Sequence, residues 1–145
     1  MNNSFIPAVF KDKLANIVNW FKGSFFFLLS FAIFLSIFTF NINDDSFLTK
    51  SSGTTSNVIG TVGSYSASFL IYSFGIMSYL IVIFFLTLSI ATFRKKEFEF
   101  FFIRLLFLLI SLVLIPQIFL YWDWNYNFIT QIKTWGEISY IIFNL

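Results

Sequence analysis

Residues 24–47, SFFFLLSFAIFLSIFTFNINDDSF, change abruptly from an apolar run to a polar turn. The first seventeen of these residues carry no charge, and the adjacent carboxylates of Asp44 and Asp45 follow soon after. Seventeen residues approach the roughly 20 that an α-helix needs to cross about 30 Å of hydrocarbon. Carboxylates are costly inside lipid. The stretch therefore predicts a membrane-spanning helix that ends just before the two aspartates.

The composition of the whole chain points to a membrane protein. Of 145 residues, 58% are hydrophobic and 11% are charged, whereas soluble domains have about a quarter charged residues. The chain has no Cys and no His, which excludes thiol catalysis, disulfides, zinc sites and histidine general bases. A Walker A motif is also absent from the sequence. We therefore predict no catalytic residue, no bound metal and no cofactor in this chain.

Three apolar segments predict an all-α, polytopic membrane bundle with spans at about 23–40, 69–93 and 100–122. A fourth span is predicted to begin in WGEISYIIFNL, residues 135–145, and to be truncated at Leu145. In the third segment, Arg104 is expected to reach back to the headgroups beside Glu97 and Glu99. Pro116 and Gln117 are expected to kink its far end.

The basic residues predict the orientation of the spans. Lysines precede the first segment and residues 94–96 follow the second, while the connecting loop has only Lys50 against two aspartates. The positive-inside rule then places the N-terminus and residues 94–99 in the cytoplasm. Residues 41–57 would then lie on the outer side of the membrane, which is expected to be a bacterial inner membrane.

A short helix is predicted before the first span. Its apolar residues fall at helical spacing, with polar residues around the rest of the wheel, which indicates an amphipathic segment at the membrane surface. The alternative is a disordered basic tail. We accordingly divide the chain into a cytoplasmic amphipathic segment, 1–22, and a membrane domain, 23–145. The apolar residues of the amphipathic segment are Phe10, Leu14, Ile17, Val18 and Phe21.

Small residues mark the entry to the second span. Asn57 is expected to cap a helix there, and the small residues that follow fall near one face, which favours close helix packing in a membrane. The predicted packing residues are Gly60, Gly63, Ser64, Ala67 and Gly75.

We call residues 41–47 the acidic turn. Its Asp44 and Asp45 could bind a cation or a partner, but a solvated turn is the favoured interpretation, since no other acidic group or His is near in sequence. The candidate contact residues for a partner are Asn41, Asp44, Asp45, Ser46 and Phe47.

The series of motifs resembles the N-terminal four-helix membrane region of the FtsK/SpoIIIE family of DNA translocases. Residues 41–47, NINDDSF, resemble the family's NPxDPSW/F signature. Asn57 with Gly60 and Gly63 is similar to its N-x-x-G-x-x-G-A entry, and residues 70–80, LIYSFGIMSYL, to its LLxxFGLxAYL segment. Ile42 and Asp45 stand where the family has prolines, so Asn and Asp side chains are expected to form the turn.

The resemblance implies a membrane anchor that targets a DNA-pumping motor to the division septum for chromosome segregation. It implies a lipid bilayer, cell-division proteins and further copies of the chain as partners. DNA and ATP would be bound only by a motor outside this sequence. We interpret the sequence as an N-terminal fragment. The alternative function is a small polytopic transporter or channel subunit, for which an internal repeat or a midplane charge would speak.

Overall fold

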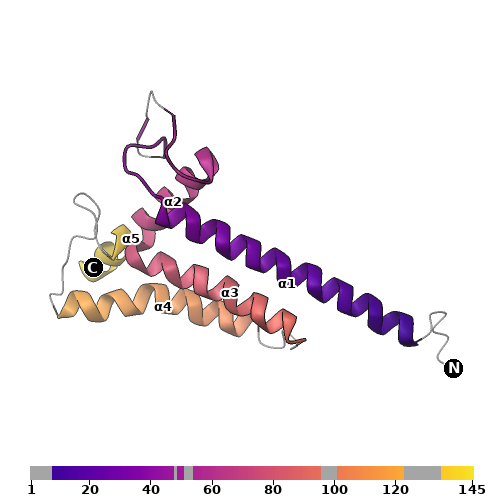
Figure 1. Cartoon of the computed structure of the whole chain (residues 1–145). Helices are drawn as coiled ribbons and strands as arrows, with labels where there is room; N and C mark the ends of the chain where they lie inside the picture. Colours follow the sequence, from indigo (N-terminus) through magenta and orange to yellow (C-terminus); the bar gives the residue numbers. More distant parts are fainter. Residues whose placement is uncertain (1–7, 48, 51–53, 96–100, 123–134) are drawn as a thin grey trace.

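The chain folds into helices joined by loops (Figure 1). The computed structural model describes residues 8–47, 49–50, 54–95, 101–122 and 135–145, and none of these residues is in a strand. The predicted all-α class is therefore confirmed. The helices are α1 (Ala8–Phe38), α2 (Gly60–Phe74), the 3₁₀-helix η1 (Gly75–Ser78), α3 (Tyr79–Phe93), α4 (Phe101–Tyr121) and α5 (Gly136–Phe143).

In the part of the chain that the structure describes, three helical stretches are long and apolar enough to cross a membrane: Phe10–Phe38, Gly60–Phe93 and Phe101–Tyr121. They confirm the three predicted spans, and the helices that contain the first and second spans begin earlier than the hydropathy suggested. The second helix begins at Gly60 rather than near residue 69. Hydropathy did not reveal its first turns because they are rich in Gly, Ser and Thr.

The predicted amphipathic segment and the first span form one continuous helix. α1 has 31 residues, which corresponds to about 46 Å at 1.5 Å per residue. The expected domain boundary after Lys22 falls inside this helix. Gly23 does not interrupt it, since a single glycine within a helix is tolerated at a cost of about 1 kcal/mol relative to Ala.

α1 and α3 lie side by side in opposite directions and are joined by hydrogen bonds from small hydroxyl side chains. Ser30 Oγ donates to the carbonyl of Val82 at 2.9 Å, and Ser89 Oγ donates to that of Gly23 at 2.9 Å. All four residues are buried. Small residues at these crossing points let the two backbones approach, as is common between membrane helices.

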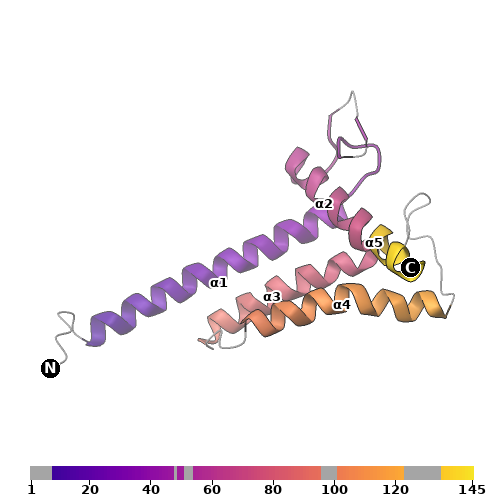
Figure 2. The ribbon, with the colours of Figure 1, turned by 180° about the vertical axis from the view of Figure 1, so that it is seen from behind.

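A break at Gly75 divides the second span. Gly75 has φ 58° and ψ −135°, a region that is essentially restricted to glycine. Its N–H still donates to the carbonyl of Ile71, so α2 closes normally before the chain turns. As a result α2 points away from α3 and α4, toward the loop that follows α1 (Figures 1 and 2).

α4 and α5 complete the domain. α4 confirms the third span and contains a buried proline, Pro116; the kink predicted there stays a prediction. α5 falls in the sequence expected to open a fourth span. It has eight residues, about 12 Å, and packs against α2 and α4.

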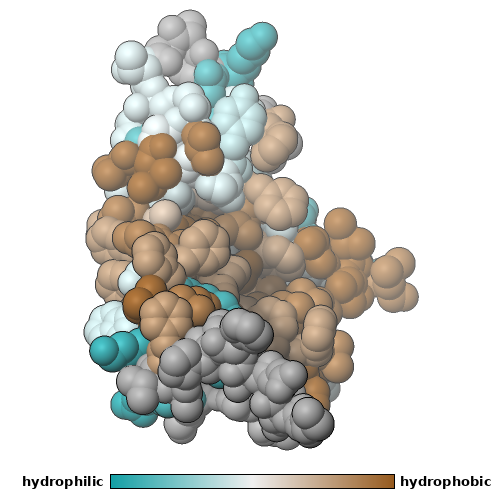
Figure 3. Space-filling model, turned by 90° about the vertical axis from the view of Figure 1, so that its right-hand side faces the viewer, coloured by the Kyte–Doolittle hydropathy of each residue, from teal (hydrophilic) through white to brown (hydrophobic). Residues whose placement is uncertain are grey.

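Polar and apolar side chains are distributed as expected for a protein in lipid. Many large hydrophobic side chains are exposed, while serine and threonine hydroxyls are buried between helices. A soluble domain shows the opposite preference. Figure 3 shows hydrophobic side chains over the middle of the surface and polar ones at its top, over the loop. The main apolar core is small, with Ile37, Ile71 and Val82 at its centre.

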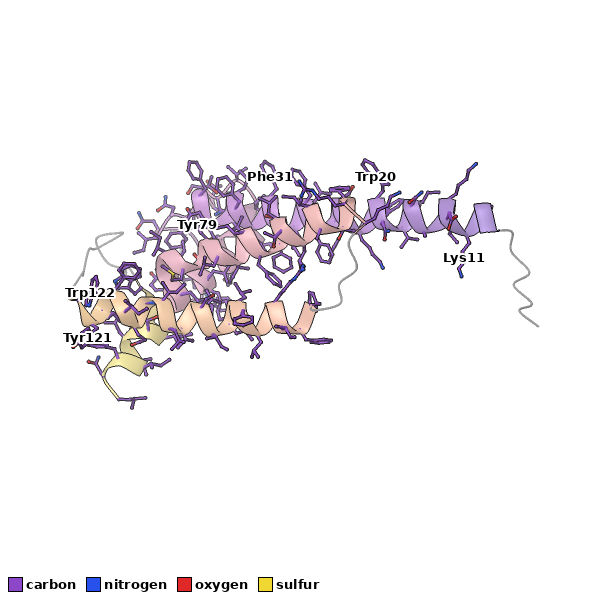
Figure 4. The ribbon with its side chains drawn as sticks, turned by 90° about the horizontal axis from the view of Figure 1, so that it is seen from below. Lys11, Trp20, Phe31, Tyr79, Tyr121 and Trp122 are labelled. Carbon is purple, nitrogen blue, oxygen red and sulfur yellow. The ribbon has the colours of Figure 1, made fainter. Side chains whose placement is uncertain are left out.

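Aromatic and charged residues mark the two membrane boundaries. Trp20 packs edge-on against Phe93, with ring centroids 5.1 Å apart, and the exposed Arg94 and Lys95 follow. Exposed Tyr121 and Trp122 lie at the opposite end of α4 (Figure 4). Trp and Tyr concentrate at membrane–water interfaces, so these groups indicate where the hydrocarbon begins and ends.

Candidate functional site at the acidic turn

Asp44 is a buried carboxylate at the centre of a partly buried hydrogen-bond network. Only 4% of the residue is exposed. Its carboxylate accepts hydrogen bonds from the backbone N–H groups of Ser56 at 2.9 Å and Asn57 at 3.0 Å, and from the Ser56 hydroxyl at 2.9 Å. The expectation of a solvated Asp44 is therefore wrong. Burial is tolerated because several donors replace the water that the carboxylate loses.

Asn57 fastens the loop to the end of α1. Its Nδ2 donates to the carbonyl oxygens of Ser36 at 2.9 Å and Thr39 at 3.3 Å, which are among the groups that a helix C-terminus leaves without partners. Its Oδ1 accepts from the N–H of Ile59 at 3.1 Å. The prediction that Asn57 caps the following helix is wrong, because α2 begins three residues later, at Gly60, without a side-chain cap.

Side chains of the acidic turn also form the turn itself. Asn41 Oδ1 accepts from the N–H of Asn43 at 3.0 Å. This Asx-turn confirms that an Asn side chain shapes the segment where the family has prolines. Ser46 Oγ lies 2.7 Å from Thr49 Oγ1. The half-buried Asp45 contributes its carbonyl, which accepts from Ser64 Oγ at 2.5 Å and so ties the turn to α2.

Phe47 is the large apolar residue that the turn presents to its surroundings. It is 70% exposed, and its ring lies edge-on to Tyr65 of α2, with centroids 5.0 Å apart. The two rings border a shallow, open hollow of about 530 Å³ on α2. The remaining lining residues are Thr61, Val62, Ser66 and Phe69. This arrangement suits an apolar contact, and it gathers no catalytic group.

The five predicted packing residues play two different roles. Gly63, Ser64 and Ala67 are buried on one face of α2. A Cβ at Gly63 would overlap Asn57 Oδ1 and the side chain of Ile59. Gly60, in contrast, has open space around it and a φ of +74°, and Gly75 has its positive φ at the break. Both have a positive φ that favours glycine. Gly75 is also buried, with its backbone against Gly136, whereas nothing packs on the Cβ position of Gly60.

Sequence reasoning missed a second junction, where α5 docks against the break. A Cβ at Gly136 would overlap the carbonyl oxygen of Ser73 and the backbone that follows it. Gln117 Nε2 donates to the carbonyl of Ser139 at 3.0 Å, and the rings of Phe119 and Trp135 stack at 4.8 Å. An amide inside an apolar span needs a partner, so Gln117 was the signal for this contact.

Charged residues supply little further chemistry in the described part of the chain. Arg104 is exposed in the first turn of α4. Its expected neighbours Glu97 and Glu99 lie outside the described residues. Among the residues that the structure describes, no group of three or more His, Cys, Asp or Glu side chains could hold a metal ion.

The fold and the site define a polytopic helical membrane domain whose buried polar groups fasten a loop and several helices together. The chain belongs to the family described as the 4TM region of DNA translocase FtsK/SpoIIIE, whose model matches residues 16–138. That region is a membrane domain and not a catalytic one. The match includes the acidic turn, the broken second span and the start of α5. No curated protein and no solved structure matches the chain.

Proposed function

We propose that this chain is the membrane anchor that holds a DNA translocase at the division septum during chromosome segregation. The observation that carries the proposal is the family match over residues 16–138, together with three helices able to span a membrane. A motor that pumps DNA through a closing septum has to be kept at that site. Spans confine it to the bilayer, and contacts with septal proteins can then select the position.

The acidic turn supports this function because it holds Phe47 in a fixed place. The turn is fastened to α1 through Asn57 and to α2 through Ser64. An exposed aromatic ring on a fixed backbone loses little conformational freedom on binding, which is typical of residues that dominate protein interfaces. We therefore assign Phe47 as the main contact for another division protein.

The buried polar groups of the spans favour an anchor over a transporter. In the described parts of the three spans, these groups are serine and threonine hydroxyls. Ser30, Ser78, Ser89 and Thr92 all donate to backbone carbonyls. Ion and substrate paths instead use charged groups inside the membrane.

The proposal includes a cytoplasmic N-terminus in the inner membrane, as the basic residues indicate.

The test follows the chain, fused to a fluorescent protein, in dividing bacteria. The fusion should concentrate at midcell after the early division ring has formed. Phe47→Ala should spread the signal around the membrane while the amount inserted is unchanged. Phe102→Ala is the matched control, since Phe102 is 81% exposed at the opposite end of the domain.

Uniform fluorescence of the unaltered chain, in cells that divide normally, would overturn the anchor proposal. Equal effects of the two substitutions would overturn the role of Phe47 alone. In the same cells, a cysteine placed at Ser52 should react with a membrane-impermeant thiol reagent and one at Lys96 should not. Labelling at Lys96 would reverse the orientation.

A further inference from the structure

α1 carries an apolar stripe that is separate from its contact with α3. Its members follow one another at alternating intervals of four and three residues, which is the 3.5-residue period of a coiled coil. All of them except Leu35 are exposed. We call this set, in which Ser24 is the one polar member, the heptad stripe: Phe10, Leu14, Ile17, Phe21, Ser24, Leu28, Phe31, Leu35 and Phe38.

The heptad stripe leaves the α1–α3 contact undisturbed. The side of α1 that faces α3 carries buried Gly23, Ser30 and Ile37. These residues lie about 100° or more around the helix from the stripe, at 100° per residue. One α1 helix can therefore pack on α3 and present most of the stripe to another molecule at the same time; Leu35 is half-buried, and Phe31 borders a hollow with Val82 and Leu86 of α3.

Lipid can cover only part of the stripe. Trp20 lies at the level of Phe93, where α3 ends beside exposed Arg94 and Lys95, and Lys11 lies far beyond that level (Figure 4). The ten residues from Phe10 to Asn19 extend about 15 Å at 1.5 Å per residue. The headgroup zone adds only about 5–8 Å on each side of the hydrocarbon. Because α1 is continuous, this part cannot fold down onto the membrane surface.

The occupant that fits the stripe is a second copy of this chain. Copies inserted in one membrane share one orientation and one depth, so their α1 helices run parallel and their stripes meet in register along the full length. In a parallel pair, Lys13 would face Val18 of the second copy rather than another lysine. The pairing thus covers apolar side chains on both sides of the boundary without placing like charges together.

We propose that α1 pairs in parallel with α1 of a second copy along the heptad stripe, through the membrane and into the water beyond Trp20. This inference does not rest on septal targeting, because pairing would occur wherever the chain is inserted.

Cysteine cross-linking tests the pairing, since the chain has no Cys of its own. Single cysteines at Leu14 and Ile17, on the stripe, are compared with cysteines at Asp12 and Asn19, on the opposite side of α1. Mild oxidation of membranes containing the full chain should give at least about five times more disulfide-linked dimer at the stripe positions. The dimer should have twice the mass of the chain.

A second variant tests whether the water-exposed part belongs to the same interface. Leu14→Glu should reduce cross-linking through a cysteine at Leu28, inside the membrane, by at least about threefold, and Asp12→Glu should not change it. Equal cross-linking at all four positions, or none, would overturn the proposal. So would products of another mass, which would indicate a different partner, or unchanged Leu28 dimers in Leu14→Glu.

Discussion

The two ends of α1 differ in how many contacts they make with the rest of the chain. At the C-terminal end, Asn57 donates to the last carbonyls of α1, and the backbone around it is held by buried Asp44. At the N-terminal end, residues 10–22 are exposed or half-buried throughout, including large apolar side chains. One end is fixed by contacts within the chain, and the other offers its surface.

This difference shows where interactions with other molecules can be expected. Buried polar groups that are fully hydrogen-bonded make a segment rigid, so the loop end can hold Phe47 in one position. An exposed apolar helix face in water has the opposite meaning, because it is stabilised only when something covers it. The same type of substitution should therefore change the free energy of unfolding more at the loop end than at the exposed end of α1.

The largest difference should come from two aspartates. Asp44→Ala removes the acceptor for the buried N–H of Asn57 and for the partly buried N–H and hydroxyl of Ser56, and an unsatisfied buried donor costs about 1–3 kcal/mol. The free energy of unfolding should fall by about 2 kcal/mol or more. Asp12→Ala, at the exposed end, should change it by less than about 0.5 kcal/mol. Reversible unfolding in detergent micelles measures both values.

Similar losses in the two variants would mean that the Asp44 network adds nothing beyond an ordinary surface charge. An intermediate variant sharpens the result. Asp44→Asn keeps one acceptor oxygen, so it should lose less stability than Asp44→Ala in the same unfolding experiment.

A smaller difference is expected when leucine is introduced at each end. Gly63→Leu places a side chain where even a Cβ would overlap Asn57 and Ile59, and overpacking of this kind costs about 1–3 kcal/mol. Ala15→Leu adds the same side chain at an exposed position of α1 and should cost about 0.5 kcal/mol or less. The same unfolding measurement decides. If Ala15→Leu were the more harmful, the exposed end of α1 would be packed within the chain after all.

The spans were predictable because the bilayer imposes a simple rule on the sequence. An uncharged run of the required length has few alternatives to a membrane helix, so α4 lies close to its expected bounds. The start of α2 at Gly60 was not predictable from hydropathy. Neither was the break at Gly75, because a glycine in an apolar run is compatible with a continuous helix and only its φ of 58° reveals the turn.

The residues of the candidate site could be picked out from the sequence, but their hydrogen bonds to distant residues could not. The turn chemistry of Asn41 follows from local sequence, and it is present. The burial of Asp44 depends on Ser56 and Asn57, twelve and thirteen residues later in the chain. No local pattern encodes such a pairing. The continuity of α1 was also missed, since the last lysine before the apolar run, Lys22, suggested a boundary, and Gly23 beside it does not break the helix.

The smallest effect should arise at the junction of α4 and α5, and it tests how far the order of the loop end extends. Gln117→Leu removes one hydrogen bond, from Nε2 to the carbonyl of Ser139, and introduces a side chain that lipid tolerates. Interhelical hydrogen bonds in membranes contribute about 0.6 kcal/mol on average, so unfolding should become easier by about 1 kcal/mol or less. Thr87→Leu is the control, because its hydroxyl bonds only to Phe84 of its own helix and is exposed. A loss as large as that of Asp44→Ala would show that the docking of α5 across the break stabilises the domain as much as the acidic turn does.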